Sequence, residues 1–166
     1  MPAWELAQLN IGVIKGPMDS PVMADFASNL ERINAVAEQS PGFVWRLQTE
    51  AGDATAIRPF DDPNLLVNMS TWRDVESLNR YVYSSAHVEV MRRRREWFER
   101  MDQAILVLWW VPQGHRPSIE EAVARLELLR KHGPTAAAFN FRSAFPAPDA
   151  GATRTPAAFD DACPAT

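Results

Sequence analysis

The chain has 166 residues, of which 46% are hydrophobic and 23% charged, and its formal net charge is −4. This length and composition predict one globular domain with a sizeable core. The acidic balance argues against nucleic acid as a partner. Only one cysteine, Cys163, is present, which excludes an intramolecular disulfide and a cysteine-based metal site.

The N-terminal segment MPAWELAQLNIG has no basic stretch followed by an apolar one, so no signal peptide is expected. The longest apolar run, AILVLWWV at 104–111, is too short to span a bilayer. We therefore expect a cytoplasmic protein without a membrane partner.

Apolar residues at both parities predict a first strand over residues 4–12. The segment GPMDSP ends it, and Asp19 or Ser20 can cap a helix that has Pro21 in its first turn. Apolar residues spaced three or four apart continue this helix to the SPG segment at 40–42.

A second strand is predicted over residues 42–50, and a long polar loop follows over 51–63. The next apolar segment, LLVNMSTW at 65–72, predicts a third strand. Thr71 and Asp74 stand at the spacing of a capping box ahead of the next helical run.

The segment SSAH interrupts that run, and a further helix is predicted to continue to Met101. The strand at 105–111 is apolar on both faces, which is typical of a central strand. Ser118 with Glu121 forms another capping box and opens a helix that ends near His132.

Residues 136–141 could form a short last strand, and the composition then changes to an Ala- and Pro-rich tail. We therefore predict one domain over residues 1–141 and a mobile tail over 142–166. The order β-α-β-β-α-β predicts an α+β ferredoxin-like sandwich, in which helices cover one face of a four-stranded antiparallel sheet.

The strands carry apolar side chains on both parities, so the second face of the sheet also needs a cover. A second copy of the sheet can supply it. The expected assembly is a homodimer with two sheets back to back, a dimeric α/β barrel.

Polar residues occur inside the predicted strands in pairs of equal parity: Gln8 with Asn10, Arg46 with Gln48, and Asn68 with Ser70. A buried polar group left without a hydrogen bond costs roughly 1–3 kcal/mol. These residues therefore suggest a polar cavity that holds water or a ligand. The alternative is an interface, or strand ends where the side chains bond to backbone or solvent.

The same parity decides which face of the sheet the aromatic strand residues occupy. Phe43, Trp45 and Trp109 have the opposite parity and would pack elsewhere, whereas an error in one strand would make Trp45 and Trp72 walls of the pocket. We include Trp45, Trp72 and Trp109 among the candidate substrate-binding residues.

Helical spacing places one stripe of side chains around a histidine: Tyr83, His87, Met91 (or Val90), Arg94 and Phe98. An imidazole in this position could be a general base near neutral pH or an axial heme ligand. The free N–H groups of a helix starting at Ser84–Ser85 could also bind an anion or enolate. The alternative is a histidine that bonds only to backbone or to a carboxylate.

Four consecutive arginines, Arg92 to Arg95, cannot share one face of a helix. One or two are expected to point to the pocket or to a partner subunit, and the others to pair with nearby glutamates. Arg94 is our candidate for stabilising a carboxylate, enolate or phenolate. The alternative is a solvated face without a function.

The two other histidines, His115 and His132, are interpreted as structural, and the three histidines show no metal-binding spacing. The absence of GxSxG, Walker A and GxGxxG motifs disfavours serine hydrolases, P-loop NTPases and Rossmann oxidoreductases.

Several segments in order carry a resemblance over residues 3–141: AQLNIG, SPGFVWRLQTE, LLVNMSTW, YSSAHVEVMRRRREWF, LVLWWVPQGHRP, and HGP followed by AFNF. They are similar to a bacterial family known as a domain of unknown function. That family resembles the antibiotic biosynthesis monooxygenases and other dimeric α/β-barrel proteins. This resemblance implies fold relatives that include cofactor-free oxygenases, heme-dependent enzymes, isomerases and binding proteins, and it transfers no catalytic residue.

Three functions remain open. The first is a cofactor-independent oxygenase, isomerase or cyclase for an aromatic or polyketide-like small molecule, with His87 as acid/base and Arg94 or Arg46 stabilising the anion. The second is a non-catalytic dimer that binds a small ligand. The third is a heme protein with His87 as axial ligand.

Overall fold

The computed structural model describes residues 3–48, 64–148 and 155–156. Its helices and strands are, in chain order, β1 (Trp4–Val13), the 3₁₀ turn η1 (Pro21–Met23), α1 (Ala24–Gln39), β2 (Phe43–Arg46), β3 (Leu65–Trp72), α2 (Val75–Val82), α3 (Ser85–Arg92), α4 (Arg94–Trp97), β4 (Leu106–Pro112), α5 (Ile119–His132), β5 (Ser143–Ala144) and β6 (Thr155–Pro156).

The main sheet has four strands in the order β2-β3-β1-β4, and every neighbouring pair is antiparallel. The central strand β1 pairs with β3 from Leu6 to Val13 and with β4 from Trp4 to Asn10. Strand order and helix order together are those of a ferredoxin-like α+β sandwich, as the sequence predicted.

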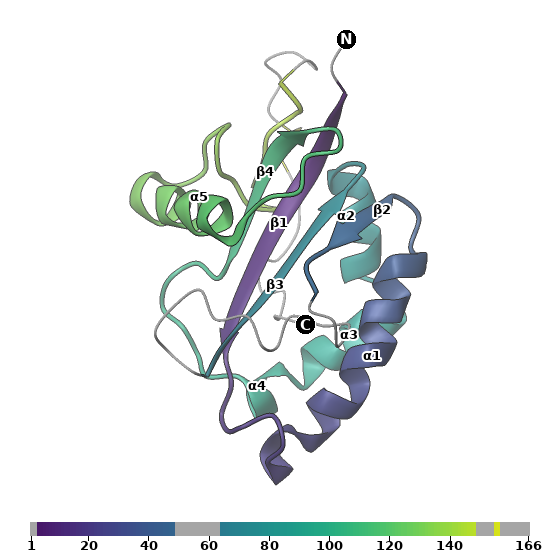
Figure 1. Ribbon diagram of the computed structural model, residues 1–166. Helices are drawn as coiled ribbons and strands as arrows, with labels where there is room; N and C mark the ends of the chain where they lie inside the picture. Colours follow the sequence, from purple (N-terminus) through teal and green to yellow (C-terminus); the bar gives the residue numbers. More distant parts are fainter. Residues whose placement is uncertain (1–2, 49–63, 149–154, 157–166) are drawn as a thin grey trace.

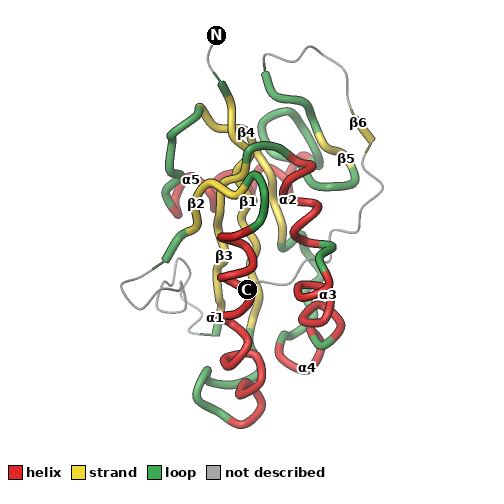
Figure 2. Tube along the Cα trace, turned by 90° about the vertical axis from the view of Figure 1, so that its right-hand side faces the viewer, coloured by secondary structure: helices red, strands yellow, loops and turns green. Residues whose placement is uncertain are grey.

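Helices lie on both faces of this sheet (Figure 1): α1 to α4 on one face and α5 on the other. Figure 2 shows α2, α3 and α4 following one another along one side of the molecule. Side-chain alternation divides the core accordingly. Leu6 and Trp72 belong to the cluster under α1 to α4, whereas Leu9 and Met69 belong to the cluster that includes Leu126 of α5.

The second face of the sheet corrects one expectation. Its strand residues are already buried within a single chain, with exposed fractions of 1% for Leu9, 4% for Val67 and 0% for Val107. Helix α5 lies over this face and contributes Ala122 and Leu126 to its core. Helix α5 of the same chain therefore supplies the cover that was expected from a partner sheet.

Strands β1, β3 and β4 lie close to their predicted positions, but β2 is shorter than the predicted strand at 42–50. Of the two described residues after Arg46, Leu47 still bonds to β3, its N–H donating to the Met69 carbonyl over 2.8 Å. The last predicted strand, 136–141, is reduced to isolated bridges: Leu108 and Phe139 exchange two backbone hydrogen bonds of 2.8 Å, and Ala138 bridges to Thr135. The polar loop predicted over 51–63 lies outside the described residues.

The helix starts also differ in detail. The first helix opens with the short 3₁₀ turn at Pro21, and its N-cap, Ser20, makes no side-chain cap. Thr71 is still in β3, so Asp74 alone caps α2, accepting from the Ser77 N–H over 2.8 Å. Ser118 caps α5 as predicted.

The helix expected to reach Met101 is broken at Arg93 and ends at Trp97. Arg93 leaves α-helical geometry (φ −97°, ψ 4°), which separates α3 from α4. The remaining residues to Met101 run alongside β1, with the Glu99 N–H donating to the Val13 carbonyl over 2.8 Å. The stripe of side chains predicted around His87 assumed one continuous helix, so it is interrupted at Arg93.

The first residues of the predicted tail pack on the domain. Ala144 is 4% exposed, and the Phe145 carbonyl accepts a hydrogen bond of 2.8 Å from Trp110 Nε1. Strand β5 pairs with β6 at residues 155–156. The rest of the tail, 149–154 and 157–166, lies outside the described residues, and its mobility stays a prediction.

Candidate functional site

A small cavity lies between the sheet and helices α1, α2 and α3. Its volume is about 20 Å³, enough for about one water molecule. Its polar lining residues are Gln8, Asn34, Arg46, Asn68, Ser70 and His87. Its aromatic and aliphatic lining residues are Phe43, Trp72, Tyr81, Phe141, Ala37, Leu78, Val82 and Leu106.

The sheet side of the cavity is a hydrogen-bonded amide–hydroxyl cluster. Gln8 Nε2 donates to Asn68 Oδ1 over 2.6 Å and to Ser70 Oγ over 2.8 Å. Ser70 Oγ also accepts from Trp72 Nε1 over 2.8 Å. One hydroxyl thus receives two donors from neighbouring strand positions, which holds the amide of Gln8 and the indole of Trp72 in place.

An aromatic wall faces this cluster. Trp72 and Tyr81 are stacked, with ring centroids 5.3 Å apart at 24°, and Phe43 meets Trp72 edge-on at 5.4 Å. The imidazole of His87 lies 4.9 Å from the Tyr81 ring. The histidine therefore ends a row of rings that begins at the edge of the sheet.

The turn between α2 and α3 places His87 there. Helix α2 ends at Val82, and the carbonyls of a last helical turn have no partner within their own helix. Ser84 caps α3 by accepting from the His87 N–H over 3.4 Å, and His87 Nδ1 lies 2.8 Å from the Val82 carbonyl oxygen. The side chain thus closes the end of one helix from the start of the next.

This contact determines the tautomer of His87. A carbonyl oxygen can only accept, so Nδ1 carries the proton and donates it, and Nε2 carries the lone pair. Burial lowers the pKa of His87 from 6.5 to about 4, although the bond to Val82 acts in the opposite direction. The imidazole is therefore neutral at pH 7, with a basic nitrogen in a buried, aromatic setting.

Of the described residues that line the cavity, Arg46 is the one with a charged side chain. Its Nε donates to Glu38 Oε1 over 2.7 Å, and the arginine side chain is 11% exposed while that of Glu38 is 44% exposed. The pair joins the edge strand β2 to α1 at the solvent side of the cavity.

The structure brings together six of the thirteen residues selected from the sequence, namely Gln8, Arg46, Asn68, Ser70, Trp72 and His87. Four of them, Gln8, Arg46, Asn68 and Ser70, were selected by parity and share one sheet face. Trp72 lies on the same face, although it was expected there only if the parity of one strand was wrong. Asn10 lies on the same face and is 1% exposed, but it does not line the cavity, although its strand partners Asn68 and Leu106 do.

Two predicted tryptophans lie on the opposite face. Trp109 is fully buried beneath α5, and its Nε1 donates to Glu121 Oε2 over 2.9 Å. Trp45 belongs to the same core cluster, with Arg116 over its ring at 6.0 Å. Neither residue lines the cavity, in agreement with their opposite parity.

The residues predicted to share one helical face with His87 do not line the cavity beside it. Tyr83 caps the end of α2 and is 45% exposed, because the chain turns there before α3 starts. Met91 packs against the core beyond the cavity. Arg94 and Phe98 follow the break at Arg93 and line a different hollow, with the Arg94 guanidinium 6.0 Å from the Phe98 ring centroid. A role for Arg94 beside His87 therefore does not fit this geometry.

Several lining residues are absent from the sequence-based set. Phe43 was expected on the opposite face, but a register irregularity between Phe43 and Trp45 turns it toward the cavity. Asn34 is 7% exposed within α1, and a polar residue beside the apolar positions Ile33 and Ala37 was a usable signal. Tyr81 gave no comparable signal.

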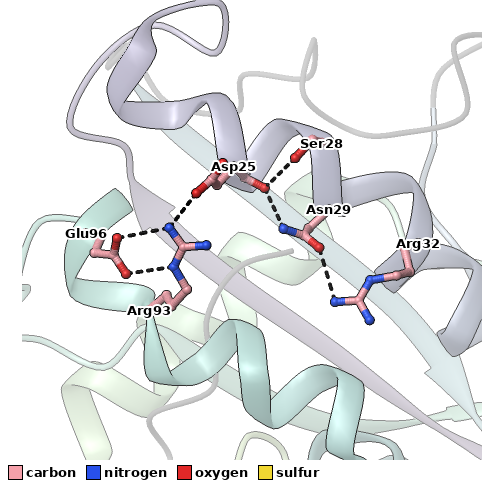
Figure 3. Close-up of polar contacts among 6 residues, drawn as sticks. All are labelled: Asp25, Ser28, Asn29, Arg32, Arg93 and Glu96. Carbon is pink, nitrogen blue, oxygen red and sulfur yellow. Dashed lines mark hydrogen bonds and ion pairs between the residues drawn. The ribbon is translucent and has the colours of Figure 1, made fainter.

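One arginine of the run, Arg93, is explained by helix packing (Figure 3). Arg93 donates to Asp25 of α1 over 2.6 Å and to both oxygens of Glu96 over 2.8 and 3.0 Å. These bonds raise the pKa of Arg93 further above its usual range, and those to Glu96 have a larger effect than the bond to Asp25. Arg93 also lies over the Trp97 ring at 4.9 Å. At the break between α3 and α4 it therefore contacts both α4, through Trp97, and α1, through Asp25.

The other predicted features lie apart from the cavity. His115 Nε2 lies 2.7 Å from Glu121 Oε1, and His132 is the last residue of α5. Over the described ranges, no three His, Cys, Asp or Glu side chains are grouped as metal ligands. Within the same ranges, none of the helices combines the length and apolar character that crossing a bilayer requires.

Comparison with known proteins gives structures of low similarity. SnoaB, a cofactor-independent oxygenase from Streptomyces nogalater, is 20% identical over 72% of this chain and 100% of its own, with a TM-score of 0.44. A conserved protein from Methanosarcina mazei Go1 is 11% identical over 64% of this chain and 90% of its own, with a TM-score of 0.47. A candidate antibiotic biosynthesis monooxygenase from Nitrosomonas europaea is 12% identical over 69% and 92%, with a TM-score of 0.43.

No activity is taken from these structures, and no curated protein matches the chain significantly. The family comparison agrees with the motifs in the sequence and covers almost the whole chain. Residues 5–155 match the family described as Domain of unknown function (DUF3291), and the chain belongs to that family.

Proposed function

We propose that the chain is a cofactor-independent enzyme that performs acid–base chemistry on a small aromatic or polyketide-like molecule. Oxygenation, isomerisation and cyclisation of such molecules all begin with removal of a proton. The observation that carries the proposal is the state of His87: buried, neutral, fixed in one tautomer by Val82, and lining a cavity with aromatic and amide groups.

In the proposed step, Nε2 of His87 takes a proton from an acidic C–H or O–H of the ligand, and the electron pair stays on the ligand as an enolate or phenolate. A base whose conjugate acid has a pKa of about 4 is weak. The ligand must therefore be activated, or its anion stabilised. Arg46 is the lining residue with the charge to do this, and Gln8 is a nearby amide donor.

The cavity volume sets a condition on this proposal. About 20 Å³ is far below the roughly 300–1,000 Å³ of ordinary ligand pockets, so a ring enters only if the surrounding elements move apart. The ion pair between Arg46 and Glu38 spans β2 and α1 at the solvent side, so its opening would release both Arg46 and the cavity entrance.

The experiment compares the wild type with His87→Asn. The asparagine Nδ2 can take over the donation to Val82, while no group replaces the basic Nε2, so the variant removes the base and keeps the helix cap. A panel of hydroxylated naphthoquinones and anthrones is screened for binding by thermal shift, and bound compounds are assayed for oxygen uptake and for products by mass spectrometry.

With a compound that the wild type converts, we expect His87→Asn to lower kcat by about 10²–10⁴-fold, with little change in binding. Arg92→Gln, an exposed change on α3 away from the cavity, serves as the control and should retain full activity. Equal turnover by His87→Asn and the wild type would remove His87 as the base.

A non-catalytic ligand-binding protein is the second candidate. It is favoured by the double structural role of His87, whose ring closes α2 while its backbone joins α3, and by a cavity that holds only about one water molecule. Binding of panel compounds without any product, unchanged in His87→Asn, would support this function over the enzyme.

A heme group does not fit the cavity around His87. A porphyrin macrocycle is many times larger than one water molecule, and Arg94, a cation that could pair with heme propionates, lines a different hollow. An absorption spectrum with added hemin checks this conclusion: we expect no Soret shift that depends on His87.

The homodimer and the cytoplasmic location remain part of the proposal. The dimer is supported by the resemblance to dimeric α/β-barrel proteins, but the second sheet face is occupied by α5, so another surface would form the contact. Light scattering after size exclusion distinguishes a dimer from one chain of 18.6 kDa.

A further inference from the structure

A second and much larger hollow lies at the opposite end of the helical layer from β2. It is formed where the end of β1, α4, the segment 98–106 and residues 140–142 meet, and its volume is about 1060 Å³. We call it the basic groove. It exceeds the cavity around His87 about fiftyfold and has the capacity for a complete metabolite.

The charges of the basic groove oppose those of the whole chain. Five basic side chains line it, against two acidic ones, Glu99 and Asp102, so its net charge is +3 in a chain of net charge −4. The basic residues are Lys15, Arg94, Arg95, Arg100 and Arg142. A positive hollow on an acidic protein concentrates anions locally while the rest of the surface repels long polyanions.

Two of these cations lack a compensating group. In residues 3–48 and 64–148, the side chains of Arg95 and Arg100 make no ion pair or hydrogen bond. Arg93, which forms ion pairs with Asp25 and Glu96, lies outside the groove. Among the described residues, no acidic side chain compensates these two guanidinium groups.

The backbone around the groove is tied to the sheet. The Lys15 N–H donates to the Trp97 carbonyl over 2.8 Å, and the Glu99 N–H donates to the Val13 carbonyl over 2.8 Å. Lys15 Nζ also donates to the Arg95 carbonyl. These bonds fix the segment that presents the arginines, which reduces the entropy lost on ligand binding.

We infer that the basic groove binds a small molecule that carries two or more anionic groups, either phosphates or carboxylates. Guanidinium groups pair with both anions through two parallel hydrogen bonds. A single carboxylate, or a single phosphate of charge about −2, would leave part of the groove's net charge of +3 uncompensated. Leu106, which is 2% exposed, lines both hollows and separates them, so the inference does not depend on the proposed role of His87.

The test is calorimetric titration with tripolyphosphate and, separately, with citrate, using the full chain at low salt. The double variant Arg95→Gln/Arg100→Gln should weaken binding at least about tenfold. Arg92→Gln removes the same charge from an exposed position that does not line the groove and should leave the affinity unchanged. Circular dichroism confirms that each variant is folded.

Binding of tripolyphosphate alone would identify phosphate groups as the ligand chemistry, and binding of citrate alone would identify carboxylates; either result supports the groove. Failure of both probes to bind at millimolar concentration would overturn the inference. It would also be overturned if Arg92→Gln weakened binding as much as the double variant, or if a single-stranded oligonucleotide bound more tightly than tripolyphosphate.

Discussion

The two ring nitrogens of His87 have separate tasks. Nδ1 closes the end of α2 through Val82, and this contact leaves Nε2 as the basic nitrogen. The structural and chemical interpretations of the sequence were framed as alternatives, yet the geometry permits both. A substitution that removes both nitrogens would mix the two effects, which is why His87→Asn is more informative than His87→Ala.

The low pKa of His87 predicts a specific acid sensitivity. The unfolded chain binds a proton at this site near pH 6.5, whereas the folded chain does so only near pH 4. The stability due to neutral His87 is thus complete above about pH 6.5 and is lost as the pH falls toward 4, by about 3 kcal/mol in total. Urea unfolding of the wild type and His87→Asn between about pH 7 and 4.5 measures this difference. Parallel pH dependence in the two proteins would contradict it.

Ser70 permits a second test at the level of one residue. Its hydroxyl accepts from both Gln8 and Trp72, so Ser70→Ala leaves two buried donors without that acceptor. We expect the free energy of unfolding to fall by about 1–3 kcal/mol. Ser28→Ala, which removes an exposed hydroxyl bonded to the Asp25 carbonyl, is the matched control and should change it by less than about 0.5 kcal/mol. Equal effects would show that the amide–hydroxyl cluster contributes little.

Strand parity predicted much of the cavity, because alternation assigns side chains to a face without knowledge of the fold. It located Gln8, Asn68 and Ser70 correctly. It failed for Phe43, since a register irregularity in the edge strand reverses the alternation there. It could not find Tyr81, because the face of α2 that meets the sheet is set by tertiary packing.

At the scale of elements, local signals succeeded where the interaction is local. The capping serine of α5 acts within three residues of its partner, as predicted. The capping box predicted at Thr71 and Asp74 is not formed, because Thr71 is in β3 and Asp74 itself is the cap of α2. The break at Arg93 was missed because its main partner outside the turn, Asp25, is 68 residues away in sequence. A run of good helix formers gives no local reason to stop there.

The turn before β2 gives a prediction at this scale. Gly42 has a φ of +87°, and a Cβ there would lie 2.2 Å from Ser77 Oγ and 2.4 Å from Ser77 Cβ at the start of α2. Gly114 has nearly the same φ, +88°, with nothing within 4 Å. Gly114→Ala should therefore show only the backbone strain, about 1–2 kcal/mol. Gly42→Ala should lose about 1–3 kcal/mol more because of the clash.

Chemical denaturation of the two alanine variants measures the difference. A larger loss in Gly42→Ala would show that close contact between this turn and α2 stabilises the helical side of the cavity. Equal losses would mean that Ser77 moves aside without cost and that the turn does not fix the position of α2.

At the scale of the whole molecule, element order predicted the topology, because short right-handed connections leave few arrangements for β-α-β-β-α-β. It did not predict the cover of the second face. The apolar pattern of α5 shows that the helix packs on something, but it does not say on which face of the sheet. Two-sided apolar strands were therefore attributed to a partner sheet when the same chain supplies the cover.

The boundary of the domain gives the last prediction. The sequence placed it after residue 141, yet Phe145 packs beside Phe139 at 5.8 Å and accepts the hydrogen bond from Trp110, and β5 pairs with β6. A chain ending at residue 142 would lose the burial of Ala144 and Phe145 and leave the indole N–H of Trp110 without this acceptor. We expect it to unfold about 2–4 kcal/mol more easily than the full chain.

A chain ending at residue 156 retains β5, β6 and the contact with Trp110, and so serves as the control. If the predicted tail beyond it is mobile, this control should match the full chain within about 0.5 kcal/mol. Urea unfolding followed by tryptophan fluorescence reports both values, because Trp110 lies at the contact itself. If the two truncated chains were equally stable, the domain would end at residue 141 as the sequence predicted. If both were less stable than the full chain, the folded unit would extend beyond residue 156.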